Sequence, residues 1–178
     1  FIFIVQKEHM EKYAFGPLLN LIAPGCKIVV TDGLTEGAAC SILLAEEHID
    51  NDDHLLLANS DQFLEWDASE FLYSMTADDI DGGISTFQSV HPCWSYAKLG
   101  DDGFVTEVAE KNPISTNATT GIYFFKHGRD FVRSAKQMIA KNIRVNNEFY
   151  TCPVFNELIG DGGKVKILDV TRMWGIGT

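Results

Sequence analysis

Positive charge is scarce in this sequence, and the scarcity argues against several classes of partner. The 178 residues include 25 Asp and Glu against 14 Lys and Arg, which gives a formal net charge of −11 at pH 7. Such a chain repels nucleic acid and anionic membrane surfaces. We therefore expect no nucleic-acid or membrane partner. A small anionic ligand is compatible with this charge if a cation or a few focused basic groups offset the field.

Long apolar runs and closely paired cysteines are also missing. No stretch reaches the ~20 apolar residues that cross a bilayer, and the start, FIFIVQKEH, has neither the basic region nor the length of a signal peptide. The cysteines show no C-x-x-C spacing, which argues against a zinc or redox motif: Cys26, Cys40, Cys93 and Cys152. We expect a cytoplasmic protein whose cysteines are buried free thiols.

Several familiar catalytic motifs do not occur. There is no P-loop of the form G-x-x-x-x-G-K-[ST], no G-x-G-x-x-G loop and no G-x-S-x-G nucleophile elbow. The five histidines show no metal-ligand spacing. The sequence therefore gives little support to covalent catalysis or to a histidine metal site.

The first half of the chain alternates apolar strands with helical patterns. Strands are predicted at residues 1–5, 27–30 and 55–57, and near-continuous apolar strands separated by helices are typical of a parallel sheet covered on both faces. The second half changes character, and Asp102-Gly103 indicates a hairpin. We expect one α/β domain over the whole chain, built as a three-layer sandwich with a mostly parallel, mixed sheet.

Periodicity and turn residues place the other elements. Helices are expected at residues 8–22 with a break or two abutting helices at Gly16-Pro17, at 35–48, at 69–75 behind an Asp67 cap, at 128–142 and at 151–159. Further strands are expected at residues 83–90, 95–99, 104–108, 120–125 and 164–170.

Asp61 stands at the end of the apolar run in LLLANSDQ. Ligands of parallel α/β sheets bind at the carboxyl ends of strands, and a carboxylate there can ligate Mg²⁺. Asp residues also commonly cap the turn that follows a strand. The residues alone leave both interpretations open. Gln62 adds an amide that could contact a sugar or a base edge.

The loop TDGLTEGAA, residues 31–39, is a second candidate. Gly33 and Gly37 lie between a strand and a helix, so a ligand could approach the backbone closely at a helix N-terminus. A tight turn that needs glycine for its own geometry explains the same residues.

Two further segments could contact a phosphorylated sugar. Lys111 in VAEKNP could hold a phosphate while Glu110 takes a sugar hydroxyl, although a solvated pair of this kind is common and contributes little. Thr120-Gly121 offers small groups and a hydroxyl, but it is equally an ordinary strand start.

The order of these segments resembles that of the sugar-1-phosphate nucleotidyltransferases. The segments are LTEGAACSILLA, LLLANSDQFLEWD, GGISTF, GFVTEVAEKNPISTNATTGIYFF, NNEFYTCPVFNELI and MWGIGT, and they extend over nearly the whole chain. This family has a GT-A-like, Rossmann-related fold and makes a nucleotide sugar and pyrophosphate from an NTP and a sugar 1-phosphate. Members found with bacterial capsule and surface-polysaccharide genes are the most similar in character.

The resemblance implies roles for individual residues. It implies Asp61 as the Mg²⁺ ligand and Lys111 as the second catalytic residue, on phosphate. It implies nucleotide contacts from Gly37, Ala38 and Ser60. It implies sugar contacts from Gln62, Glu110, Thr120, Gly121 and Glu148.

Two departures from the family pattern accompany the resemblance. The G-x-G-x-R-x-x-K-P loop that grips the triphosphate is missing, which implies that this chain begins one strand and one helix late and has little activity alone. Gly175 replaces an acid that serves many members as a second metal ligand, and the direction of Asp169 is not fixed by its alternation.

Two rival functions and several details stay open. A GT-A glycosyltransferase with a nucleotide-sugar donor is one rival, although residues 58–62 read ANSDQ where such enzymes have D-x-D. A non-catalytic nucleotide-sugar-binding or regulatory domain is the other. The sequence specifies neither base nor sugar, and it leaves homo-oligomerisation open.

Overall fold

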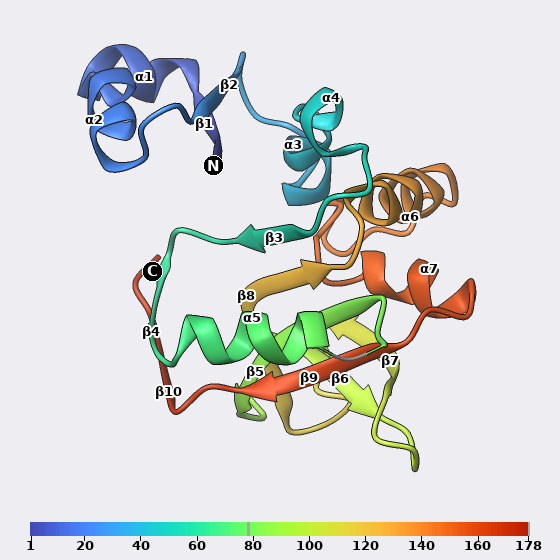
Figure 1. Cartoon of the computed structure of the whole chain (residues 1–178). Helices are drawn as coiled ribbons and strands as arrows, with labels where there is room; N and C mark the ends of the chain where they lie inside the picture. The colour runs from blue at the N-terminus through green and yellow to red at the C-terminus, as the bar shows by residue number, and fades with distance from the viewer. Residues whose placement is uncertain (78, 178) are drawn as a thin grey trace.

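The computed structural model describes residues 1–77 and 79–177, which form ten strands and seven helices (Figure 1). The strands are β1 (Ile2–Gln6), β2 (Lys27–Thr31), β3 (Leu55–Ala58), β4 (Gln62–Glu65), β5 (Gly82–Gln88), β6 (Ser95–Leu99), β7 (Val105–Glu110), β8 (Asn117–Phe125), β9 (Val165–Asp169) and β10 (Arg172–Gly175). The helices are α1 (Lys7–Tyr13), α2 (Phe15–Ile22), α3 (Ala38–Leu43), α4 (Glu46–Ile49), α5 (Ala68–Ala77), α6 (Gly128–Ala140) and α7 (Val154–Gly160). None of these helices is long and apolar enough to cross a membrane.

The main sheet has six strands in the order β7-β6-β8-β5-β9, with β3 added beside β8. Strands β5 and β9 pair in parallel, whereas β8 is antiparallel to β3, β5 and β6, and β6 is antiparallel to β7. The α/β class and the mixed sheet are confirmed. The expectation that most pairings are parallel is wrong for this sheet, because β6, β7 and β8 follow one another through short connections that reverse the chain.

Strand β8 explains why the fold has three layers. Its successive side chains point to opposite faces of the sheet. Tyr123 and Phe125 join the large core beneath α6 and α7, whereas Ile122 and Phe124 join a second core that includes residues of α5. Helices therefore cover both faces, as the three-layer prediction required.

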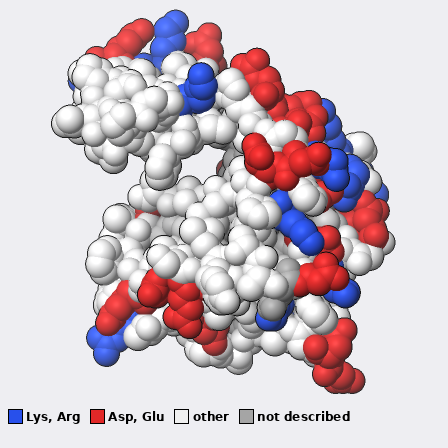
Figure 2. All heavy atoms as spheres, viewed as in Figure 1, with Lys and Arg blue, Asp and Glu red and all other residues white. Residues whose placement is uncertain are grey.

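Strands β1 and β2 form a separate parallel pair with α1 and α2, apart from the six-stranded sheet (Figure 1). The expectation that the first three strands share one sheet is wrong, because β3 pairs with β8 instead. Ile2 and Leu55, at the starts of β1 and β3, line a cavity of about 160 Å³ between the two sheets. Figure 2 shows the surface hollowed between the N-terminal elements and the rest, with mainly uncharged walls.

Helix boundaries agree with the sequence in some places and differ in others. Asp67 caps α5 as predicted: its Oδ1 accepts bonds from the backbone nitrogens of Ser69 at 2.8 Å and Glu70 at 3.1 Å. The first helical region is two abutting helices, as expected, but α1 and α2 meet at Ala14, where φ is 49°, and not at Gly16-Pro17. Pro17 instead lies in the first turn of α2, a position that tolerates its missing N–H.

Two features of secondary structure differ from the predictions. The helix expected at residues 35–48 is two shorter helices, α3 and α4. The short antiparallel pair of β4 and β10 was not predicted, because a strand of four residues with one remote partner gives a weak pattern. This pair matters for function because it brings the C-terminal segment against the end of β3.

Candidate functional site

Asp61 lies in the bend between β3 and β4, and it is exposed. The Asn59 backbone nitrogen donates to the carbonyl oxygen of Gly121 at 3.0 Å, which ties the bend to β8. Gln62 is half-buried at the start of β4, and its side-chain amide donates to the Asn59 carbonyl at 2.8 Å. The Asp61 carboxylate accepts no hydrogen bond and forms no ion pair within residues 1–77 and 79–177. The turn-capping interpretation of Asp61 therefore has no support.

The segment after β10 lies directly against this carboxylate. The Ile176 backbone nitrogen donates to the Asp61 carbonyl at 2.8 Å. A Cβ atom added to Gly177 would lie 2.6 Å from Asp61 Oδ2, so glycine is what permits this approach. Gly175 pairs with Gln62 across the strands, and a Cβ there would lie 3.2 Å from the Trp94 ring.

These residues can hold a magnesium ion only if substrate phosphates or waters supply further oxygen ligands to it. Among the described residues no three His, Cys, Asp or Glu side chains gather into a metal cluster. Mg²⁺ is commonly held by one or two carboxylates together with waters and substrate phosphates. The exposed Asp61 carboxylate meets that requirement as a single ligand.

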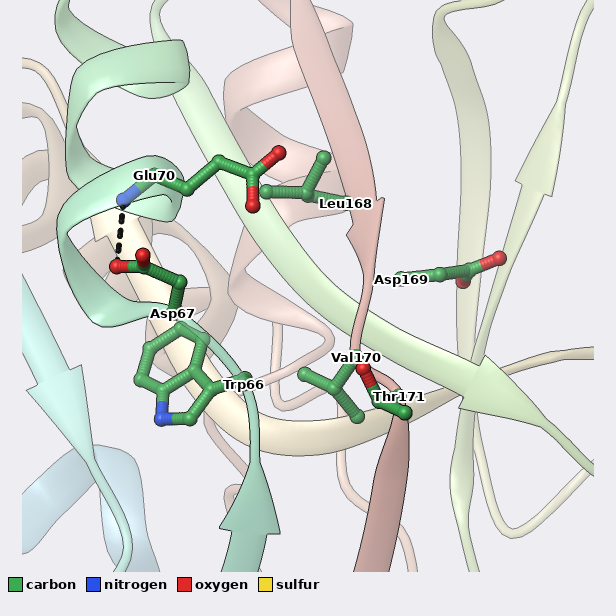
Figure 3. A pocket seen from close by; sticks show the side chains of 7 residues that line it. All are labelled: Trp66, Asp67, Glu70, Leu168, Asp169, Val170 and Thr171. Atoms are coloured by element: carbon green, nitrogen blue, oxygen red, sulfur yellow. Dashed lines mark hydrogen bonds between the residues drawn. The ribbon is translucent and has the colours of Figure 1, made fainter.

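Asp169 does not direct a second metal-binding carboxylate into the cavity that it helps to line. Figure 3 shows its side chain pointing away from Trp66 and Glu70, which line a cavity of about 70 Å³ with it. Its Oδ1 accepts a bond from the Thr86 hydroxyl at 2.6 Å, and its Oδ2 accepts a longer one from Gln88 at 3.4 Å. The cavity is far smaller than the roughly 300–1,000 Å³ of typical small-molecule sites.

Gly37 and Ala38 form the start of α3. Gly37 has φ of +128°, and a Cβ there would lie 2.5 Å from the backbone nitrogen and oxygen of Phe149. The Phe149 nitrogen donates to the Glu36 carbonyl at 2.8 Å, and the Ala39 nitrogen donates to the Phe149 carbonyl at 3.0 Å. Ala38 is exposed, so one side of this turn is closed by Phe149 while Ala38 faces solvent.

Lys111 directly follows β7 in a left-handed conformation, with φ of +54°. Its backbone nitrogen donates to the Trp94 carbonyl at 3.0 Å, and its ammonium donates to the Tyr150 hydroxyl at 2.5 Å. The Tyr150 hydrogen bond raises the pKa of Lys111 above its ordinary value, and the nearby carboxylates of Glu110 and Glu148 act in the same direction. Lys111 is therefore a fixed positive charge at neutral pH.

Glu110 is buried beside Lys111, at 9% exposure. Its carboxylate accepts a hydrogen bond from the Ser95 hydroxyl. Burial raises the pKa of Glu110, and the Ser95 bond and the Lys111 charge oppose that rise. Beneath it lie Tyr123 and Cys152, whose pKa values are both raised by burial. Glu110 thus belongs to a buried group of polar side chains and is less open to solvent than Lys111.

Compared with the wild type, Glu110→Gln is expected to become progressively more stable as the pH rises. A carboxyl whose pKa is raised in the folded state contributes stability below its unfolded pKa, and that contribution is lost as the pH rises through the folded pKa. Between about pH 4.5 and about pH 7.5 the free energy of unfolding of Glu110→Gln should therefore increase relative to that of the wild type. Urea denaturation at both pH values measures it, and a pH-independent difference would contradict the assignment.

The other expected sugar-side residues occupy different environments. Thr120 is 2% exposed and its hydroxyl has no hydrogen-bond partner among the described residues, so it lies beneath the surface. Gly121 has φ of +85° in a bulge of β8, and the Asn59 side chain fills the space beside it. Glu148 and Ser60 are exposed. Of the cysteines, which are all free, only Cys152 is buried, so the expectation of four buried thiols is wrong.

The structure brings the expected residues together in three groups. Asp61 and Gly121 form the first group, and Asn59 lies between them. Glu110, Lys111 and Glu148 form the second group, because their charges interact. Gly37 and Ala38 form the third group, which is held by Phe149. The chain itself joins the second group to the third, because Glu148 and Phe149 are consecutive.

Tyr150, Ser95 and Asn59 were not among the site residues predicted from the sequence. Tyr150 occurs in the NNEFY segment that indicated Glu148, but its contact with Lys111 joins positions 39 apart. The serine and the asparagine were visible as polar residues beside candidate segments, at the start of β6 and at the end of β3. Their partners could not be read from the local pattern.

No protein-family model matches this sequence, and no curated protein gives a significant match. Solved structures do match. A nucleoside-diphosphate-sugar pyrophosphorylase from Vibrio cholerae RC9 aligns with 100% of this chain and 76% of its own, with a TM-score of 0.79 and 25% identity. A Bacillus anthracis protein named as a candidate glucose-1-phosphate thymidylyltransferase, solved with sucrose, aligns with 99% of this chain and 70% of its own, with a TM-score of 0.77 and 18% identity.

A third structure extends the comparison. The inositol-1-phosphate CTP transferase of T. maritima aligns with 100% of this chain and 70% of its own, with a TM-score of 0.73 and 14% identity. All three neighbours are named for reactions on nucleotides and phosphorylated sugars or polyols. The chain therefore has the fold of nucleotidyltransferases of known structure, which supports the resemblance found in its sequence.

Proposed function

We propose that this chain is a sugar-phosphate nucleotidyltransferase domain that joins an NMP group to a sugar 1-phosphate. The observation that carries the proposal is Asp61, an exposed carboxylate without a protein partner among the described residues, standing at the end of β3 in this fold. A carboxylate left free at a strand end suits a cation better than it suits a structural role. The similarity to the Vibrio cholerae pyrophosphorylase supports the reaction class.

The reaction needs positioning and charge neutralisation. A phosphate oxygen of the sugar 1-phosphate attacks the α-phosphorus of the NTP, a new P–O bond forms, and the bond from that phosphorus to the bridging oxygen of the β-phosphate breaks, so pyrophosphate leaves. Lys111 would hold the sugar phosphate in line, and Gly37 and Ala38 would contact the base. Asp61 would hold Mg²⁺, which when bound offsets negative charge on the phosphates.

Sugar contacts are proposed for the surface between β4, β7 and the segment after α6. Gln62, Glu110 and Glu148 supply polar groups there, with Ser60 on the nucleotide side. Thr120 and Gly121 would act from beneath, by shaping β8. Membership in the capsule and surface-polysaccharide type, and a cytoplasmic location, follow from the resemblance and belong to this proposal.

Binding is the first test of the proposal. Because the sequence has no G-x-G-x-R-x-x-K-P loop, turnover by this chain is expected to be low. Calorimetry with ATP, CTP, GTP, UTP and dTTP should show that one of them binds more tightly with Mg²⁺ than without it. A coupled assay with glucose 1-phosphate, galactose 1-phosphate and mannose 1-phosphate should then detect pyrophosphate. Absence of nucleotide binding by folded protein would overturn the proposal.

Two rival functions are separated by their products. A glycosyltransferase with a nucleotide-sugar donor would release a nucleoside diphosphate and no pyrophosphate. A non-catalytic domain would bind nucleotide or nucleotide sugar without turnover, and it is favoured by Gly175, which stands where the resemblance implies a second acid. Measuring both products in the same assay distinguishes all three functions.

A further inference from the structure

Tyr150 contacts the proposed phosphate-binding lysine directly. The Lys111 ammonium donates to the Tyr150 hydroxyl at 2.5 Å, and the same nitrogen lies 4.6 Å from the centroid of the ring. The hydrogen bond is therefore made at the hydroxyl end of the ring. A phenylalanine at position 150 would keep the ring and remove this bond.

Lys111 depends on such a partner more than most lysines do. Its side chain is long and flexible, and the carboxylates of Glu110 and Glu148 are close enough to act on its charge. An ammonium released from Tyr150 could pair with either of them. A lysine that pairs with a neighbouring acid is less available to an incoming phosphate, so the hydroxyl determines where the charge stands.

The residue before Tyr150 holds the turn on the nucleotide side. Phe149 is 2% exposed and exchanges backbone hydrogen bonds with Glu36 and Ala39 on either side of Gly37. Arg144 adds an ion pair to Glu36 at 2.5 Å, and its guanidinium lies 4.0 Å from the Phe149 ring. Segment 144–150 thus touches the proposed base site and the proposed phosphate site through consecutive residues.

We propose that Tyr150 is a positioning residue, which holds the Lys111 ammonium where it meets the sugar phosphate and fixes it relative to the Gly37 turn. The identity of the anion rests on the proposed function. The contact between the two side chains does not. Tyr150 acts through Lys111 and need not touch the substrate itself.

Tyr150→Phe tests this role, with Tyr73→Phe as the matched control on an exposed tyrosine of α5. The Lys111 side-chain resonances should titrate at lower pH in Tyr150→Phe than in the wild type, and Tyr73→Phe should leave them unchanged. This NMR measurement needs no ligand. In the presence of the Mg-nucleotide, the affinity for glucose 1-phosphate should fall roughly tenfold in Tyr150→Phe, as expected for a lost bond to a charged group.

A second background separates positioning from a general structural effect. In Lys111→Ala the added Tyr150→Phe change should alter the affinity for glucose 1-phosphate by less than about twofold, because the group that the hydroxyl positions is gone. An unchanged Lys111 titration in Tyr150→Phe, or tighter binding of glucose 1-phosphate, would overturn the proposal. If the wild type binds no sugar phosphate at all, the proposed function fails, while a shifted titration still supports Tyr150 as the group that positions Lys111.

Discussion

Replacing Asp61 with asparagine is expected to lower the Mg²⁺-dependent affinity for the preferred NTP by about 100-fold, or about 2.7 kcal/mol. The amide is similar in size but carries no charge, so it is a much poorer ligand for a hard divalent cation. Without Mg²⁺ the variant should bind NTP as well as the wild type or better, because a negative charge facing the phosphates is gone. Calorimetry with and without the metal measures both effects.

Asp101→Asn is the matched control for this prediction. Asp101 is exposed in the hairpin turn between β6 and β7, and its replacement changes the net charge by the same amount. It should leave the metal dependence unchanged. If Asp61→Asn weakens NTP binding equally with and without Mg²⁺, or if Asp101→Asn has the same effect, Asp61 is not a metal ligand.

The overall charge of the protein makes this metal dependence a strong requirement. A chain with a formal charge of −11 repels the NTP and the sugar phosphate alike. Lys111 supplies positive charge next to two carboxylates, so a divalent cation at Asp61 is the direct way to lower the repulsion. The affinity for the anionic substrates should accordingly depend on Mg²⁺ more than on the ionic strength.

Local features of the fold could be predicted from the sequence because local chemistry determines them. The Asp67 cap, the Asp102-Gly103 turn and the apolar strands each depend on residues a few positions apart. Strand partners do not: β5 pairs with β9 across about half of the chain, and β3 pairs with β8. The predicted parallel sheet failed for that reason, since an apolar strand has the same sequence pattern beside either kind of neighbour.

The candidate site divides in the same way. Asp61 was visible because an acid interrupts an apolar run, and Lys111 because it follows a strand. The sequence could not show that the Asp61 carboxylate has no partner within residues 1–77 and 79–177, or that Gly177, 116 positions away in the sequence, approaches it closely. The buried state of Thr120 also depends on remote packing. Residue types and order could be read from the sequence, whereas exposure and partners required the structure.

Replacing Phe125 with alanine is expected to cause the largest loss of stability, with the free energy of unfolding falling by about 3–5 kcal/mol. Phe125 is 0% exposed at the end of β8. Its ring stacks on Phe155 with centroids 4.5 Å apart and meets Phe131 edge-on at 5.3 Å. Truncation leaves a cavity between the sheet and helices α6 and α7, which a packed interior refills only in part. Urea denaturation followed by tryptophan fluorescence measures the change.

Tyr73→Ala removes an aromatic ring of similar size from the exposed side of α5, where the side chain is 75% exposed. It should change the free energy of unfolding by no more than about 0.5 kcal/mol. A loss below about 1 kcal/mol in Phe125→Ala would mean that this core is not packed as described. Below the unfolding transition Phe125→Ala should still bind the Mg-nucleotide, because the Asp61 bend is tied to β8 at Gly121, four residues before the cavity. Phe125→Ala is therefore expected to lose stability while it keeps ligand binding, whereas Asp61→Asn is expected to lose ligand binding while it keeps stability.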